Sequence, residues 1–140
     1  MIFLIYSFTI VGVSSGTSGE GKALIDEVQA NGYKINPPDV IGITKDSSGK
    51  IIWLEKGHLG GKPSGLAHII DAHESNFNAK GIASDDIADY VLTAVSKGDI
   101  VGYQGKGKGR PIYEVEYQGK TYQVAVTVGD NGYIVGANPR

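Results

Sequence analysis

Cysteine is absent from this sequence. Its absence excludes a disulfide framework, a cysteine nucleophile and thiolate metal sites. Histidine is scarce, with 3 residues, so few side chains could carry protons near neutral pH. The net charge is only −2, which argues against a uniformly basic nucleic-acid-binding surface but leaves room for a local basic patch.

Long hydrophobic runs are also missing. The longest, residues 2–13, is shorter than the roughly 20 residues that a membrane-spanning helix needs. No Lys or Arg precedes this run, so it is an incomplete secretory signal, a strand, or a remnant of a longer protein. The 140 residues suit one domain. We therefore expect an apolar appendage and a short helix at 1–35, and a single domain at 36–140.

Helical patterns dominate the first part of the chain and strand patterns the last part. Asp130-Asn131-Gly132 is a strong hairpin turn between two of the strand patterns. The order predicts an α+β fold that ends in an antiparallel meander. Helices are expected at 20–30, 65–80 and 85–97, capped in the last two cases by Ser64 and Ser84, and strands at 40–44, 50–55, 99–104, 112–117, 120–128 and 133–135.

The turn Gln118-Gly119 predicts the register of one hairpin. A two-residue turn pairs Tyr117 with Lys120, and side chains then alternate between the two faces of the sheet. One face carries apolar residues and covers the helices, whereas the other is polar and free to meet solvent or a ligand. The apolar set is Tyr113, Val115, Tyr117, Tyr122, Val124, Val126 and Val128, and the polar set is Glu114, Glu116, Thr121, Gln123 and Thr127.

Two histidines lie on one predicted helix. His68 and His73 are five residues apart, so their directions differ by about 140° and they cannot share a metal as an i, i+4 pair would. No carboxylate cluster accompanies them, and we predict no metal site. His73 lies on the apolar stripe, and it is either a proton carrier or a core histidine bonded to backbone. His68 lies off the stripe, and it is either a proton carrier or a solvated surface residue.

Cations gather in one glycine-rich segment. Lys106, Lys108 and Arg110 alternate with glycines, which favours phosphate contacts over a plain polar connection between strands. The segment is not a P-loop, because no Ser or Thr follows the lysines. With Glu114 and Thr127 on the polar face, this set suits cleavage of RNA without a cofactor: a base takes the ribose hydroxyl proton, cations stabilise the phosphorane, and an acid protonates the leaving oxygen.

Several segments, in this order, resemble a known family. They are IIWLEKG at 51–57, SGLAHIIDAH at 64–73, VGYQG at 101–105, GRPIYE at 109–114 and VTVGDNGYIVGANP at 126–139. Together they resemble the C-terminal toxin module of bacterial filamentous-haemagglutinin and contact-dependent growth inhibition exoproteins. The resemblance covers roughly residues 37–140. Ala72 departs from it, since a basic residue is expected there, and so does the longer loop at 58–63.

The resemblance implies a fold and a setting. Such modules are similar to the barnase/EndoU/colicin/RelE ribonucleases, with N-terminal helices on a four- or five-stranded antiparallel sheet, and many attack tRNA. It further implies a surface exoprotein whose end acts in the target-cell cytoplasm, no membrane contact in the mature module, a cognate immunity protein, and a host translation factor as a candidate partner. The family positions that carry over are His68, His73, Arg110, Glu114 and Thr127.

These observations lead to one hypothesis and two alternatives. The hypothesis is a metal-independent ribonuclease toxin that cleaves tRNA or another structured RNA. It uses His68 as acid or base, His73 as its partner or structural support, Arg110 on the phosphate, and Lys106 and Lys108 on the flanking backbone. The first alternative is a non-catalytic protein- or RNA-binding module. The second is a DNA nuclease, disfavoured because no metal-ligand cluster is visible.

Overall fold

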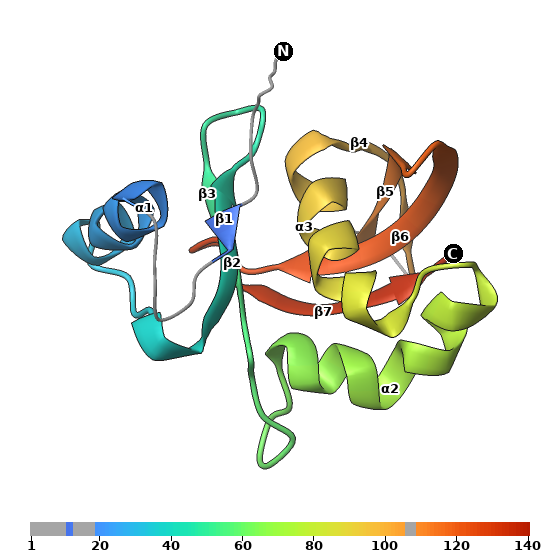
Figure 1. The fold of residues 1–140 in the computed structure, drawn as a ribbon, viewed down its shortest axis with the longest axis horizontal. Coiled ribbons are helices and arrows are strands. Elements are labelled where there is room, and N and C mark those ends of the chain that lie inside the picture. The colour runs from blue at the N-terminus through green and yellow to red at the C-terminus, as the bar shows by residue number, and fades with distance from the viewer. Residues whose placement is uncertain (1–10, 13–18, 106–108) are drawn as a thin grey trace.

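The computed structural model describes residues 11–12, 19–105 and 109–140. Three α-helices and two antiparallel sheets make an α+β fold (Figure 1). The helices are α1 (Gly19–Ala30), α2 (Gly65–Ala79) and α3 (Ile87–Lys97), with 3₁₀ turns at Pro37–Asp39 and Ser84–Asp86. The strands are β1 (Val11–Gly12), β2 (Val40–Lys45), β3 (Ile51–Glu55), β4 (Asp99–Gln104), β5 (Arg110–Tyr117), β6 (Lys120–Val128) and β7 (Ile134–Pro139).

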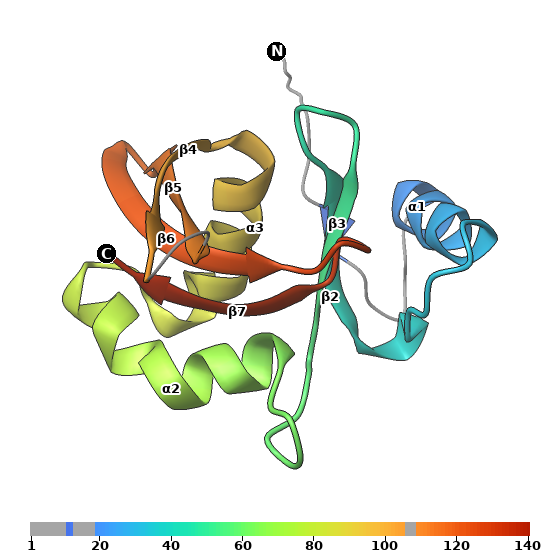
Figure 2. The same cartoon turned by 180° about the vertical axis from the view of Figure 1, so that it is seen from behind.

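The strands divide into two sheets. One has the order β1-β2-β3 and the other β4-β5-β6-β7, with every pairing antiparallel. Helix α3 lies against the larger sheet, and α2 runs alongside its edge strand β7 (Figures 1 and 2). The expected helices on a four-stranded antiparallel sheet are therefore present. Helix α1 instead packs on the smaller sheet.

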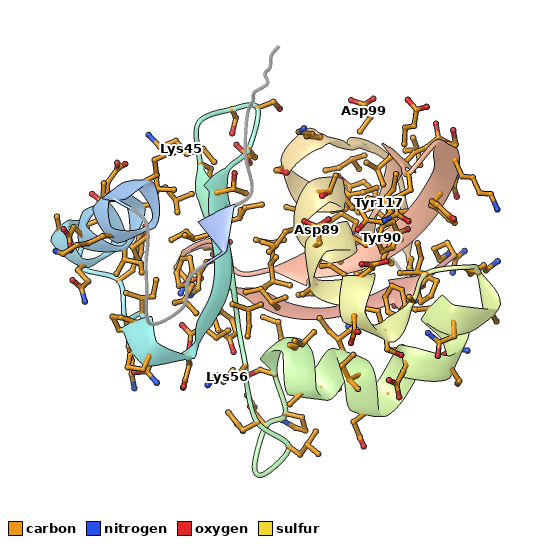
Figure 3. All side chains as sticks on the ribbon, viewed as in Figure 1. Lys45, Lys56, Asp89, Tyr90, Asp99 and Tyr117 are labelled. Atoms are coloured by element: carbon orange, nitrogen blue, oxygen red, sulfur yellow. The ribbon has the colours of Figure 1, made fainter. Side chains whose placement is uncertain are left out.

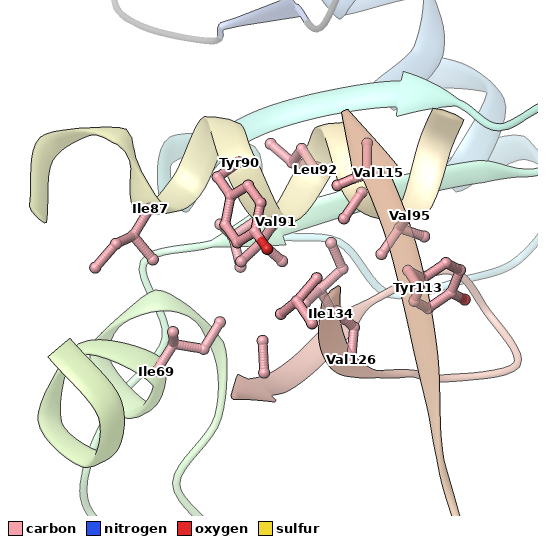
Figure 4. Close-up of a cluster of buried hydrophobic side chains, with 14 of the residues drawn as sticks. Ile69, Ile87, Tyr90, Val91, Leu92, Val95, Tyr113, Val115, Val126 and Ile134 are labelled. Atoms are coloured by element: carbon pink, nitrogen blue, oxygen red, sulfur yellow. The ribbon is translucent and has the colours of Figure 1, made fainter. Parts of the chain in front are cut away.

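The register predicted for the β5–β6 hairpin is confirmed. Tyr117 pairs with Lys120, and Tyr113 pairs with Val124. The apolar face of this hairpin enters the main core, where it meets Ile69 of α2 and Val91 of α3 (Figure 4). The residues of that face are Tyr113, Val115, Tyr117, Val124 and Val126, all buried, with Tyr122 and Val128 partly buried against them. The opposite face is therefore the polar one, as expected.

A second core joins α1 to the smaller sheet. Ile25 and Val28 of α1 pack with Ile43 and Trp53, and both Ile35 and Val40 belong to the same cluster. The boundary expected between residues 35 and 36 therefore runs through a shared core. The two sheets are also tied together, since the Trp53 amide donates to the Gly132 carbonyl at 3.0 Å.

Of the two expected helix caps, Ser64 is at the expected position and Ser84 is not. Ser64 does occupy the N-cap position of α2, but its hydroxyl bonds to the Tyr133 hydroxyl at 2.9 Å and makes no capping bond. Ser84 begins a 3₁₀ turn rather than capping α3, which starts at Ile87. The hydroxyl of Ser84 hydrogen-bonds to the side-chain amide of Asn78. Tertiary partners thus compete successfully with the local backbone for both hydroxyls.

Tyrosines form an edge-to-face cluster in the main core. Tyr90 packs against Tyr117, Tyr122 and Phe77, with ring centroids 5.2–5.9 Å apart. The Tyr117 hydroxyl donates to the Asp89 carboxylate at 2.8 Å, and these side chains lie together in Figure 3. Burial raises the pKa of Tyr90, and burial together with the Asp89 contacts raises the pKa of Tyr117.

We expect stability to fall in alkaline solution. Between the tyrosine pKa of the unfolded chain, about 10, and the higher folded value, the native state holds more protons, so the free energy of unfolding decreases as pH rises. Urea unfolding at several pH values above 9 measures the slope. Tyr117→Phe should make this slope shallower, whereas Tyr33→Phe, at an exposed position, should leave it unchanged. Equal slopes in all three proteins would contradict this assignment.

Candidate active site

Two candidate side chains meet over one glycine on the polar face. Gly136 lies on β7, and the position of an added Cβ atom there is 3.3 Å from Nη2 of Arg110 and 3.4 Å from Cδ2 of His68. Arg110 comes from β5 and His68 from the first turn of α2. Residues far apart in sequence thus bring an imidazole and a guanidinium to the same point on the sheet. His68 is half-buried here, not a freely solvated surface residue.

A tight crossing of the chain sets the start of α2 and hence the place of His68. Gly57 and Gly65 pass so closely that a Cβ on Gly57 would lie 1.9 Å from the Ser64 carbonyl oxygen, and both have positive φ. His58 and Ser64 exchange backbone hydrogen bonds at 3.1 Å across the base of the loop. The predicted loop at 58–63 is therefore closed at its base, and its position fixes the first turn of α2.

Arg110 is held by a neutral partner. Its Nη1 donates to Oδ1 of Asn138 at 2.9 Å. Partial burial lowers the pKa of Arg110, but an arginine stays charged at neutral pH. Among the described residues, no carboxylate side chain forms an ion pair with this guanidinium. Its charge is therefore positioned without being neutralised.

A pair of amides spans the polar face. Nδ2 of Asn138, on β7, donates to Oε1 of Gln104, on β4, at 2.8 Å, and Nε2 of Gln104 donates back to Oδ1 of Asn138 at 3.2 Å. Strands β4 and β7 are the two edges of the larger sheet, so the sheet curls until its edges touch through these side chains. Ile112 lies on this face and is nonetheless buried. The face expected to be open is therefore bridged at this end.

Thr127 belongs to the same place. It pairs directly with Gly136 across β6 and β7, and directly opposed residues in an antiparallel pair direct their side chains to one face. Thr127 is therefore the neighbour of the point where His68 and Arg110 meet. The structure brings these three predicted residues together.

Glu114 lies on the same face but farther along β5. It is four residues from Arg110, so their Cα atoms are roughly 13 Å apart along the strand. Its side chain is exposed, and Oε2 accepts a hydrogen bond from Nε2 of Gln123 at 3.1 Å. The structure does not bring this carboxylate to His68 and Arg110.

His73 is neither a core residue nor a contact of Arg110 in the described part of the chain. It is half-buried, and its Nδ1 lies 3.0 Å from Oδ1 of Asn76 on the same helix. Of the two alternatives for His73, the core histidine bonded to backbone is wrong, because the residue lies outside the buried core and its Nδ1 meets a side chain. Of the other predicted residues, Lys106 and Lys108 lie outside the described residues.

A hollow of about 620 Å³ lies elsewhere, beside the smaller sheet, and is lined by Asp39, Glu55 and His58, among others. These polar groups are already engaged. Glu55 accepts from the Trp53 indole at 2.8 Å, Asp39 accepts from the Asn36 amide, and Nδ1 of His58 donates to the Gly60 carbonyl. The carboxylates and the imidazole named here are therefore already paired within the protein.

No group of three or more His, Asp or Glu side chains within 11–12, 19–105 and 109–140 is arranged to hold a metal ion. Among the helices of the same ranges, none has the length and apolar character needed to cross a bilayer.

Gln104 and Asn138 are the site residues that sequence reasoning missed. Asn138 follows Gly136 by two positions in a strand, and this spacing places both on one face. That signal was present, but the partner of Asn138 could not be read from it, because the contact with Gln104 depends on the curl of the sheet.

Compared with known proteins, the chain matches no protein-family model and no curated protein.

Gly136→Ala should displace the side chains above it. The new methyl would meet the flexible ends of His68 and Arg110 at 3.4 Å and 3.3 Å, so the fold should lose about 1 kcal/mol, the low end of the cost of overpacking, while the His68 NMR signals shift. Gly102→Ala is the matched control, since its nearest neighbour would be Ile112 Cδ1 at 3.9 Å. Unchanged His68 signals in Gly136→Ala would refute this placement.

Proposed function

We propose that this protein is a metal-independent endoribonuclease. The observation that carries the proposal is the meeting of His68 and Arg110 over Gly136, with Thr127 beside them. An imidazole can exchange protons near neutral pH, and an unneutralised guanidinium can stabilise the charge that develops on phosphorus. These are the groups that cleavage next to a ribose hydroxyl requires.

In the proposed reaction, His68 takes part in the proton transfers. As the base it would accept the proton of the ribose 2′-hydroxyl, whose oxygen then attacks the adjacent phosphorus. Arg110 would bind the non-bridging phosphate oxygens, and the Thr127 hydroxyl would help to orient them. The bond to the 5′-oxygen then breaks, leaving a cyclic phosphate and a free hydroxyl. Two proton transfers are needed, so a second group acts as the acid.

His73 and Glu114 are the candidates for that second group. His73 lies on the same helix as His68, and Glu114 lies on the same sheet face as Arg110. In the free protein, each is engaged with a neighbour, Asn76 and Gln123 respectively. The acid must reach the leaving oxygen of the bound RNA rather than His68 itself, and catalytic hydrogen bonds often form only in the complex with substrate, so both residues are tested as the acid.

The resemblance supports the rest of the proposal. A helix-on-sheet α+β fold is compatible with the barnase/EndoU/colicin/RelE ribonucleases, and we propose that this chain shares that fold. We further propose that the substrate is tRNA or another structured RNA in a competing bacterial cell. The setting would be the end of a surface exoprotein, opposed by an immunity protein.

His68→Ala should lower cleavage of total tRNA by about 100-fold or more, because it removes a proton carrier. Arg110→Gln should also slow cleavage strongly. The assay is run with the purified protein in EDTA, and gel analysis with end-group mapping detects the cyclic phosphate. His58→Ala is the matched control, since His58 lies in the loop before α2 and bonds to Gly60. It should cleave like the wild type.

The same assay separates the alternatives. Binding of tRNA without any fragments would favour a non-catalytic module, and cleavage of plasmid DNA that EDTA abolishes would favour a DNA nuclease. Either result contradicts the ribonuclease proposal, as does full activity in His68→Ala. The pH–rate profiles of His73→Ala and Glu114→Gln, measured in the same assay, identify the acid. Removal of the acid abolishes one limb of the profile.

A further inference from the structure

Two arginines converge on the Gln104–Asn138 amide pair. Arg110 Nη1 donates to Oδ1 of Asn138 at 2.9 Å, and Arg140 Nη1 donates to Oε1 of Gln104 at 3.0 Å. The two acceptor amides are themselves joined by reciprocal hydrogen bonds. One guanidinium is thus attached to each end of a single neutral bridge across the polar face.

The backbone beneath this bridge is also fixed. Arg110 pairs with Gln104 across β4 and β5, and the Arg140 amide donates to the Gln123 carbonyl at 3.0 Å. Asn138 pairs with Ala125 of β6. All four strands of the larger sheet therefore contribute to the placement of the two guanidinium groups. The sheet therefore fixes the backbone of both arginines, and the amide pair orients the guanidinium of the exposed Arg140 side chain.

The chemistry of the bridge distinguishes it from an ordinary structural network. Carboxylates are the stronger partners for arginine and commonly hold it through two parallel bonds. Here both acceptors are amides, and among the described residues no side-chain carboxylate pairs with Arg110 or Arg140. An amide oxygen orients a guanidinium and leaves its full charge available to an anion. Such an arrangement is suited to binding a polyanion.

We propose that Gln104 and Asn138 are positioning residues that hold Arg110 and Arg140 as a two-phosphate clamp on RNA, with Arg110 on the phosphate beside His68 and Arg140 on a neighbouring phosphate. The identity of the ligand as RNA rests on the proposed function. The clamp itself requires only that the ligand carry successive phosphates. In this proposal Arg140 is a binding residue. The amide pair orients both guanidinium groups without neutralising their charge.

Binding to an uncleavable oligonucleotide tests the clamp apart from catalysis. The probe is a fluorescent single-stranded RNA with 2′-O-methyl groups throughout, titrated by anisotropy at several salt concentrations. Arg140→Gln should weaken binding roughly tenfold at low salt and reduce the slope of log K against log salt by about 0.7, the share of one phosphate on a single strand. Lys120→Gln removes an exposed cation at the distant β5–β6 turn, and should leave both unchanged.

Asn138→Asp tests the neutral bridge itself. The substitution keeps the size of the side chain but places a carboxylate on Arg110. We expect the fold to be retained at a small cost in thermal stability, because the carboxylate cannot replace the bond from Nδ2 to Gln104, while binding weakens roughly tenfold and the salt slope falls. Gln104→Glu places the charge on Arg140 and provides a second, independent variant, so that a folding defect in one does not remove the test.

The outcomes separate the clamp from the ribonuclease proposal. Weaker binding and shallower slopes in Arg140→Gln, Asn138→Asp and Gln104→Glu support the clamp, even if the wild-type protein leaves RNA intact and the ribonuclease proposal fails. Wild-type affinity and slope in Arg140→Gln and in the folded amide variants would overturn the clamp, even if the protein cleaves RNA.

Discussion

The missing side chain at Gly136 is the constraint on which the site depends. Helix α2 lies alongside β7, and at this position the strand exposes its backbone to both His68 and Arg110. A Cβ atom here would lie 3.3 Å from Arg110 Nη2 and 3.4 Å from His68 Cδ2, so both side chains would have to shift to accommodate it. Glycine at this position lets the ends of the His68 and Arg110 side chains lie close above the strand backbone.

The packed core beneath the sheet and the neutral partners of the arginines then determine what the site can do. The core on the other face of the sheet is apolar and tightly packed, so the sheet is a firm support for groups on its polar face. On that face, amide oxygens orient the arginines while leaving their charge intact. A positive charge held in place before the ligand arrives loses little free energy in reorganisation when an anion binds, which is the physical basis of electrostatic catalysis.

Much of the fold could be predicted from the sequence, because local patterns carry it. The turn at Gln118-Gly119 determines the β5–β6 register, and alternation then separates the buried face from the polar face. The hydrogen bonds that cap the helices were less predictable. The hydroxyls of Ser64 and Ser84 have tertiary partners, Tyr133 and Asn78, that no local rule reveals.

The site was predictable only in part, for the same reason. Residue types singled out His68, Arg110 and Thr127, and these three do meet at Gly136. Glu114 shares their face but not their position, because a period of two gives the face of a strand and not the distance along it. The Gln104–Asn138 bridge depends on the curl of a four-stranded sheet, which is a property of the whole fold.

The central claim is that His68 and Arg110 act on the same phosphate. A double-mutant cycle on RNA cleavage measures this most directly, with kcat/KM determined for the wild type, His68→Ala, Arg110→Gln and the double variant. If the two groups act together, the double variant should lose little more activity than the worse single variant, because each loss already removes the shared step. Losses that multiply across the two substitutions would show that the groups act independently and would contradict the account.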